Sequence, residues 1–163
     1  MVTSTIDALD GRLLQALADT PRAGVLELAR QLGVARGTVQ ARLDKLQDRG
    51  VITGFGPSVG MPALGYEVEA FTTIDIAQGR LGDVVDHLRD IPEVLEAHSI
   101  SGPGDLHCRV VAHTNAHLQD VINRILEVQG IVRTTTVIAL SNQIPHRVMP
   151  LVASASGPGP GGS

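Results

Sequence analysis

A short glycine-rich turn holds the residues whose types and spacing best suit a small ligand. The segment SISGPGDLHC, residues 99–108, places two glycines and a proline between apolar runs. The glycines leave backbone N–H groups open to a negatively charged group, and Asp105 beside them can hold an ammonium group. An amino acid carries both charges, whereas a plain β-turn also favours Gly, Pro and Asp, and both interpretations stay open. The candidate ligand-binding residues here are Ser101, Gly102, Pro103, Gly104, Asp105 and Leu106.

A second group of candidate residues lies on the run ARGTVQARLDKLQDRG, residues 35–50. Val39, Leu43 and Leu46 recur there at helical spacing. With these three inward, the outward face has small residues in its middle and long polar residues at its N-terminal end, which suits a major groove. The alternative is an ordinary solvated helix face. The candidate base-reading residues are Arg36, Gly37, Thr38 and Gln40, and the candidate phosphate contacts are Arg42, Lys45 and, in the preceding TPRAG turn, Arg22, for which a structural ion pair is equally open.

The charge of the chain is uneven along its length. The 163 residues carry a formal net charge of -4. Residues 1–60 contain seven Lys and Arg against six Asp and Glu, whereas residues 61–163 contain six against eleven. The acidic total argues against a generally basic nucleic-acid coat. The asymmetry fits either a nucleic-acid role for the N-terminal part or ordinary scatter of surface charge.

The sequence lacks the motifs of a disulfide framework, a metal site, a catalytic site and a membrane-spanning segment. The single cysteine, Cys108, excludes a disulfide within one chain and is expected to be a small buried hydrophobe. His98, His107 and His113 fit no standard metal motif, and neither a phosphate loop nor a GxSxG turn occurs. We therefore expect no metal, no cofactor and no catalytic residue. Without a run of ~18 apolar residues or a signal peptide, we expect a cytoplasmic protein with no membrane partner.

Three short helices are predicted to position the basic residues. The first follows Asp7 as N-cap, the second covers residues 25–32 and the third covers residues 36–49. Helices joined by such tight turns form a helix-turn-helix unit. The segment GVITGFGP, residues 50–57, alternates like one or two short strands and is expected to supply a wing. Residues 1–60 are thus predicted to form a winged helix-turn-helix DNA-binding domain.

The rest of the chain predicts a sheet with helices on one side. Strand-like patterns occur in YEVEAFTTIDIA, VLEAHSIS, DLHCRVVAHT and IVRTTTVIAL, and helical spacing occurs in LGDVVDHLRDI and NAHLQDVINRILEVQG. The order βαββαβ is typical of a ferredoxin-like module, so the fold class is α+β and residues 61–150 form the second domain. Residues 151–163, which end in a run of Gly, Pro and Ser, are expected to be a disordered tail.

Two helices can cover only one face of such a sheet. A mixed polar and apolar face is better covered by another subunit than by water, so we expect a homodimer through the sheets. The histidines are then expected to belong to the subunit interface. The residues predicted on this face are Glu67, Phe71, Thr73, His98, His107, Arg109, Val111 and His113.

The motifs together resemble one protein family. They are LDxxLL in the first predicted helix, PRAxxxELAxxLGV around the second, TVQxRLxKLxxRGVI along the third, and ALGY after the wing. The chain from about Asp7 to Leu140 resembles the Lrp/AsnC family of leucine-responsive and asparagine regulators, also called feast/famine regulators. One departure is Ala35, where the family usually has Ser. The missing side-chain cap should cost ~1 kcal/mol of local helix stability.

The resemblance implies a sequence-specific transcription regulator of double-stranded DNA. It also implies a small effector, expected to be an amino acid, bound at the GPGD turn between dimers, with help from Thr134 and Thr136. A ring of four dimers, an octamer, is the implied assembly. Two alternatives stay open: an enzyme like the haem-precursor decarboxylases, which resemble this family in fold, and a nonspecific architectural DNA binder. The near-neutral N-terminal charge speaks against the last.

Overall fold

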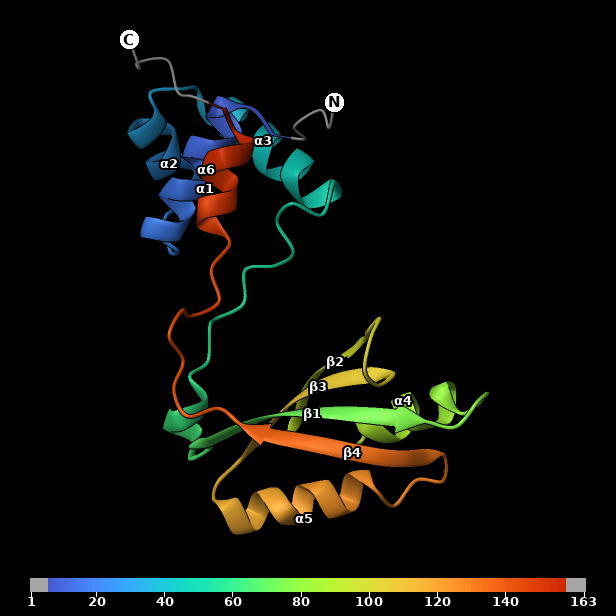
Figure 1. The fold of residues 1–163 in the computed structure, drawn as a ribbon. Helices are drawn as coiled ribbons and strands as arrows, with labels where there is room; N and C mark the ends of the chain where they lie inside the picture. Colours follow the sequence, from blue (N-terminus) through green and yellow to red (C-terminus); the bar gives the residue numbers. More distant parts are fainter. Residues whose placement is uncertain (1–5, 158–163) are drawn as a thin grey trace. The chain divides into compact units, whose positions relative to one another are not determined.

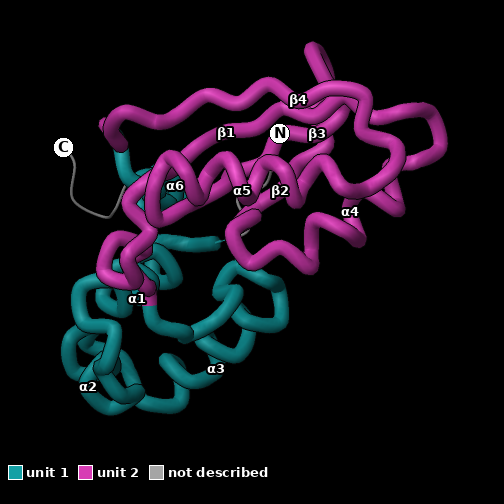
Figure 2. The backbone as a smooth tube through the Cα atoms, turned by 90° about the horizontal axis from the view of Figure 1, so that it is seen from below, with its two compact units in different colours: residues 1–57, 144–163 teal, residues 58–143 magenta. Residues whose placement is uncertain are grey.

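The structure is a computed structural model that describes residues 6–157, and it divides into two compact units. Of the described residues, 6–57 and 144–157 belong to the first unit, and residues 58–143 form the second (Figure 2). The first unit therefore draws on both ends of the chain. Each unit has a hydrophobic core of its own.

The helices predicted for the first unit are all present. They are α1 (Ala8–Asp19), α2 (Val25–Leu32) and α3 (Arg36–Asp48) (Figure 1). Asp7 caps α1 as predicted, because its carboxylate accepts hydrogen bonds from the backbone N–H groups of Leu9 and Asp10, each at 2.9 Å. Gly33 ends α2 in the left-handed region, at φ 67°, which permits the tight turn into α3. The core of this unit is formed by Ile6, Leu13, Leu28, Ala29, Val39, Leu43 and Leu46.

The strands expected in the wing are not formed. None of residues 51–60 adopts strand structure. The backbone N–H groups of Val51 and Ile52 bond instead to the carbonyl of Leu46, and both side chains pack against the core. Beyond them, two glycines and Pro57 follow, and the one large apolar side chain, Phe55, is 59% exposed. This segment therefore has neither a partner strand nor a buried face to hold it extended.

A helix stands where the beginning of a disordered tail was expected. Helix α6 (Met149–Ala155) packs on α1 in the first unit, and Val152 contacts the core of that unit. This burial gives the helix an apolar contact that the Gly, Pro and Ser composition does not suggest. The remaining expectation, for residues 158–163, falls outside the described residues.

The second unit has the predicted βαββαβ order. A short 3-10 helix η1 (Met61–Leu64) precedes β1 (Val68–Ile76), α4 (Leu81–Arg89), β2 (Val94–Ser99), β3 (Leu106–Ala112), α5 (Asn115–Ile125) and β4 (Ile131–Ile138). The strands form one antiparallel sheet in the order β2-β3-β1-β4, which is the ferredoxin-like arrangement. The α+β fold class is confirmed.

Both helices of the second unit cover the same face of the sheet (Figure 1). Their apolar residues, among them Val84, Leu118 and Ile125, pack against the inward residues of β1 and β3. Cys108 lies in this core with no exposed surface, and burial raises the pKa of its thiol to about 11. The expectation of a small buried hydrophobe at Cys108 is therefore confirmed. No described helix is long and apolar enough to cross a membrane.

Candidate functional sites

The outward face of α3 presents the residues predicted to read DNA. Arg36, Thr38 and Gln40 are exposed in the first two turns, and Lys45 is exposed one turn further along. Arg36 is the first residue of the helix, so its side chain stands beside the tight turn that follows α2. Gly37 is also exposed, and a Cβ built there would meet no atom within 4 Å. No described residue of the first unit therefore blocks a close approach to this face at Gly37.

The charges on this face are largely unpaired. Within residues 6–157, Arg36 and Lys45 form no ion pair, so both cations stay available to a negatively charged partner. The amide of Gln40 donates to Asp44 at 2.8 Å, which orients it along the helix surface. Arg22 is exposed in the turn between α1 and α2. It has no ion-pair partner in the described part of the chain either, so the structural alternative for Arg22 finds no support.

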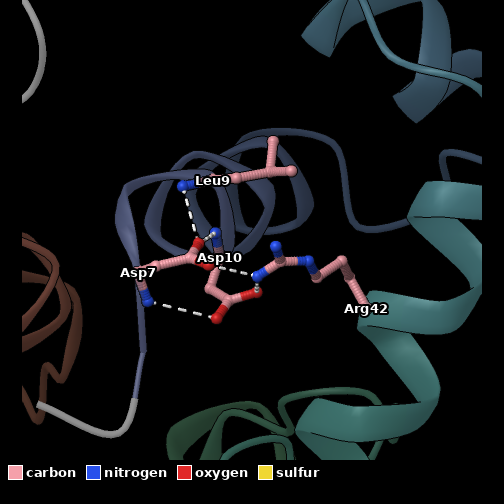
Figure 3. Close-up of polar contacts among 4 residues, drawn as sticks. All are labelled: Asp7, Leu9, Asp10 and Arg42. Carbon is pink, nitrogen blue, oxygen red and sulfur yellow. Dashed lines mark hydrogen bonds and ion pairs between the residues drawn. The ribbon is translucent and has the colours of Figure 1, made fainter.

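Arg42 differs from the other basic residues of α3. Its guanidinium forms ion pairs with Asp7 and with Asp10, the latter at 3.0 Å, and its side chain is only 29% exposed (Figure 3). Asp7 and Asp10 form the reciprocal cap of α1, since the Asp10 carboxylate accepts from the Asp7 backbone N–H at 3.1 Å. Arg42 therefore joins the recognition helix to the start of α1. The predicted role of Arg42 was a phosphate contact, and these partners, which lie 32 and 35 residues away in the sequence, were not predicted.

These contacts shift the pKa of both kinds of group. Hydrogen bonds from the Asp10 backbone N–H and from the Arg42 side chain lower the pKa of Asp7. Hydrogen bonds to Asp7 and Asp10 raise the pKa of the Arg42 guanidinium. Both shifts favour the charged forms, so the cluster is an ion pair throughout the neutral range.

The glycine-rich turn between β2 and β3 has a backbone that only glycine adopts easily. Gly102 and Gly104 have φ values of 129° and 86°. A Cβ at Gly104 would lie 2.4 Å from the Thr73 side chain, so a larger residue there would require movement. Neither glycine donates its N–H to an acceptor within the described residues. Two backbone donors are thus available at the turn, beside the exposed Ser101 and Pro103.

Asp105 has a structural role in the same turn. One carboxylate oxygen accepts from the Ile76 backbone N–H at 2.6 Å, and the Asp105 N–H donates to the Ile74 carbonyl at 2.9 Å. The side chain remains exposed, so its second oxygen can still accept from a ligand. Leu106, also a candidate, is only 2% exposed and belongs to the core. Its side chain cannot contact a ligand at the surface, because the alternation of β3 directs it toward the helices.

Thr134 and Thr136 do not join the turn within one chain. In the register of β4 with β1 they pair with Ile74 and Thr72, whose side chains face the helices. The hydroxyl groups of Thr136 and the fully buried Thr72 form a hydrogen bond of 3.0 Å. The turn instead approaches Thr73, on the opposite face. A joint site of turn and threonines would therefore need a second copy of the chain.

The sheet face away from the helices is polar with an aromatic patch. Arg109 lies between Glu69 at 2.5 Å and Glu96 at 3.4 Å, and His107 stacks on Phe71. His98 lies opposite His107, as predicted. Two of the residues predicted for this face lie outside the strands: Glu67 precedes β1, and His113 follows β3 and stacks on Tyr66. Val111 pairs with Glu69 on this face as predicted, although it is only 3% exposed.

Among the described residues, no group of three or more His, Cys, Asp or Glu side chains is placed to hold a metal ion. His117 and Arg124 contact the buried carboxylate of Glu93, at 3.3 Å and 2.7 Å, and the sequence analysis did not single out this cluster. Burial acts to raise the pKa of Glu93, but hydrogen bonding from Arg124 and the backbone outweighs it and lowers the pKa. The cluster is thus a charged structural contact between α5 and the start of β2.

Two family models match the chain. Residues 6–53 match the model described as a winged helix-turn-helix DNA-binding domain. Residues 69–149 match the model described as the Lrp/AsnC ligand binding domain. The first match lies within the first unit, and the second match includes the sheet except Val68, the first residue of β1.

Two similar proteins are named as regulators. The chain is 34% identical over 147 residues to regulatory protein AsnC of Escherichia coli K12, covering 89% of this chain and 97% of that protein. It is 34% identical over 143 residues to the HTH-type transcriptional regulator Rv2324 of Mycobacterium tuberculosis, covering 85% of this chain and 95% of that protein.

Solved structures give the same similarity. The structure of E. coli AsnC matches with a TM-score of 0.83 at 33% identity, covering 89% of this chain and 99% of that chain. A feast or famine regulatory protein of M. tuberculosis, Rv3291c, solved in complex with L-methionine, matches with a TM-score of 0.77 at 29% identity, covering 87% and 97%.

Proposed function

This chain belongs to the Lrp/AsnC family of transcription regulators, and we propose that it binds specific double-stranded DNA under the control of an amino acid. The observation that carries the proposal is the outward face of α3. It presents Arg36, Thr38 and Lys45 to solvent, and neither cation forms an ion pair with a described residue. Base edges and phosphates are the partners that such a face of a recognition helix fits.

We propose the turn of residues 101–105 as the effector site. Its support is chemical: two unused backbone N–H groups suit a carboxylate, and the free oxygen of Asp105 suits an ammonium group. Charge-assisted bonds of this kind are roughly twice as strong as neutral ones. The L-methionine bound to the M. tuberculosis relative supports an amino acid as the ligand class. Thr134 and Thr136 of a second copy are proposed to complete the site, in an assembly of homodimers up to an octamer.

The proposal is tested in two steps. A thermal-shift screen of the twenty amino acids identifies a ligand of the folded state, since such a ligand raises the melting temperature by mass action. Binding to the DNA upstream of the chain's own gene is then titrated with and without that amino acid. We expect a salt-sensitive complex with this DNA that the amino acid strengthens or weakens, and we expect Asp105→Ala to bind DNA but lose the response.

Other outcomes would contradict the proposal in distinct ways. Footprints that do not depend on sequence would indicate an architectural DNA binder. A tetrapyrrole that copurifies and is visible by absorbance would indicate an enzyme. If Asp105→Ala responds as the parent does, Asp105 acts only in the turn and the effector site lies elsewhere.

A further inference from the structure

The C-terminal helix α6 is held in the first unit by a close contact with α1 (Figure 1). Val152 packs against the core of the first unit, and Ser156, directly after the helix, is half-buried. The helix has only seven residues, and Leu151 beside Val152 is 68% exposed. Its docking therefore depends on few contacts, and small changes at those contacts can release it.

The contact is closest at Gly11, inside α1. Gly11 is buried, and a Cβ built on it would lie 2.5 Å from the Cβ of Ser156 and 2.6 Å from its Oγ. Apart from its chain neighbours and the nearby backbone of α1, no other atom of residues 6–157 lies within 4 Å of that position. Glycine inside a helix is otherwise unfavourable, because it loses more conformational freedom than alanine. The close approach of Ser156 gives a physical reason for glycine at this position.

The docked helix changes how the two units are connected. The chain passes from the first unit to the second at residues 57–58 and returns at residues 143–144. Neither residues 53–60 nor residues 139–148 form helix or strand. With α6 released, only the first connection would hold the DNA-binding unit. With α6 docked, both connections hold it, and residues 139–148 then join β4 to the helix that packs on α1.

We propose that α6 is the element that transmits the effector's influence to the DNA-binding unit. The proposal rests on the proposed function. A ligand moves an equilibrium only by its different affinity for two states, and docked and released α6 provide two such states. Effector binding at the second unit then acts on the recognition helix through α6 and α1. When α6 is released, DNA binding persists but no longer responds to the effector.

The docking itself is tested by a double-mutant cycle between Gly11 and Ser156. Gly11→Ala alone should lower the denaturation midpoint of the first unit, or raise it less than helix propensity predicts, because the new methyl group meets Ser156. In a Ser156→Gly background the same change should raise the midpoint, because, apart from its chain neighbours and the nearby backbone of α1, no other atom of residues 6–157 lies within 4 Å. The control is Gly37→Ala in α3 of the same unit, whose Cβ would meet nothing within 4 Å and which should act equally in both backgrounds. Equal effects of Gly11→Ala in both backgrounds would overturn the docking.

The transmission is tested on upstream DNA with each of the twenty amino acids as probe. Gly11→Ala and a chain ended after residue 148 should both bind this DNA without the amino acid as the parent does, and should lose the change that the amino acid causes. An unaltered response in either variant, each shown to be folded by circular dichroism, would overturn the role of α6. If the parent itself binds no upstream DNA, the proposed function fails, and the midpoint measurements still decide the docking.

Discussion

At the scale of single residues, two arginines of α3 have opposite surroundings and should have opposite effects. Arg36 is exposed without an ion-pair partner in the described residues, whereas Arg42 neutralises the buried Asp10. Arg36→Ala should relax sequence choice and weaken operator binding by ~1–3 kcal/mol if it reads a base, with little effect on unfolding. Arg42→Ala should lower the free energy of unfolding by ~1–3 kcal/mol, because it leaves a buried carboxylate without its cation.

Both arginine variants are compared in the same two assays. Fluorescence anisotropy with operator and scrambled DNA measures sequence choice, and urea unfolding followed by circular dichroism measures stability. Unchanged operator binding by Arg36→Ala at moderate salt would exclude a base contact. If the Arg42→Ala variant keeps its stability but loses DNA affinity, Arg42 is instead a phosphate contact.

The cap of α1 gives a second prediction at this scale, which concerns the stability of the chain at low pH. The pKa of Asp7 is lowered in the folded chain, so its charge stabilises the fold at neutral pH, and this contribution is lost as the pH falls below about 4 toward the folded pKa. Asp7→Asn keeps a capping oxygen but has no charge. The advantage of the parent over Asp7→Asn in urea unfolding should therefore be present at pH 7 and shrink as the pH falls below about 4. A difference that stays constant over this range would contradict the assignment.

At the scale of elements, α3 begins without a side-chain cap. Ala35 has the extended backbone of an N-cap, at φ -66° and ψ 146°, and its side chain accepts no hydrogen bond. Ala35→Ser should supply the missing acceptor and raise the free energy of unfolding by ~1 kcal/mol. Ala41→Ser, within the exposed part of the same helix, is the control and should destabilise slightly, because Ser has lower helix propensity than Ala. Equal effects of the two changes on the urea midpoint would argue against the cap.

The elements that the sequence predicted well are those with periodic apolar residues. Helices α1, α2 and α3 and the four strands of the second unit were predicted from such patterns, and their order led directly to the fold class. The prediction of strands in the wing was wrong, because the alternation of residues in GVITGFGP does not indicate whether a partner strand is present. Helix α6 was missed because its docking depends on Gly11, more than a hundred residues away. A pattern within one short segment cannot show a contact of that kind.

For the candidate sites too, features that depend on a local pattern could be predicted, and contacts between distant segments could not. The exposed face of α3 could be predicted because it is the complement of a helical apolar stripe. The partners of Arg42 could not, because an ion pair between α1 and α3 depends on how the helices pack. Leu106 was assigned to the ligand from its place in a turn, although the strand alternation buries it. The side of β4 that Thr134 and Thr136 occupy depends on register, which is set by pairing with β1.

At the scale of the whole molecule, the sheet face away from the helices bears on assembly. It carries Phe71 stacked on His107, and Arg109 between Glu69 and Glu96, so apolar and charged groups alternate over a flat surface. A two-fold axis through such a face would place the same residues on both sides of the interface. The stack of Phe71 and His107 could then be buried, while Arg109 and the glutamates supply charges of both signs.

We predict that the chain is at least a dimer at micromolar concentration, with an even-numbered assembly such as an octamer as the expected larger form. Light scattering should give a mass of at least twice the 17.1 kDa of one chain. Phe71→Glu should shift the mass toward the monomer while circular dichroism stays unchanged, because it removes apolar area and places a like charge on both sides of the two-fold interface. Gln119→Glu, which adds the same charge on the exposed side of α5, should leave the mass unchanged.

A folded parent that remains a monomer under these conditions would refute pairing through the sheets. A parent dimer that Phe71→Glu leaves intact would move the interface to another surface.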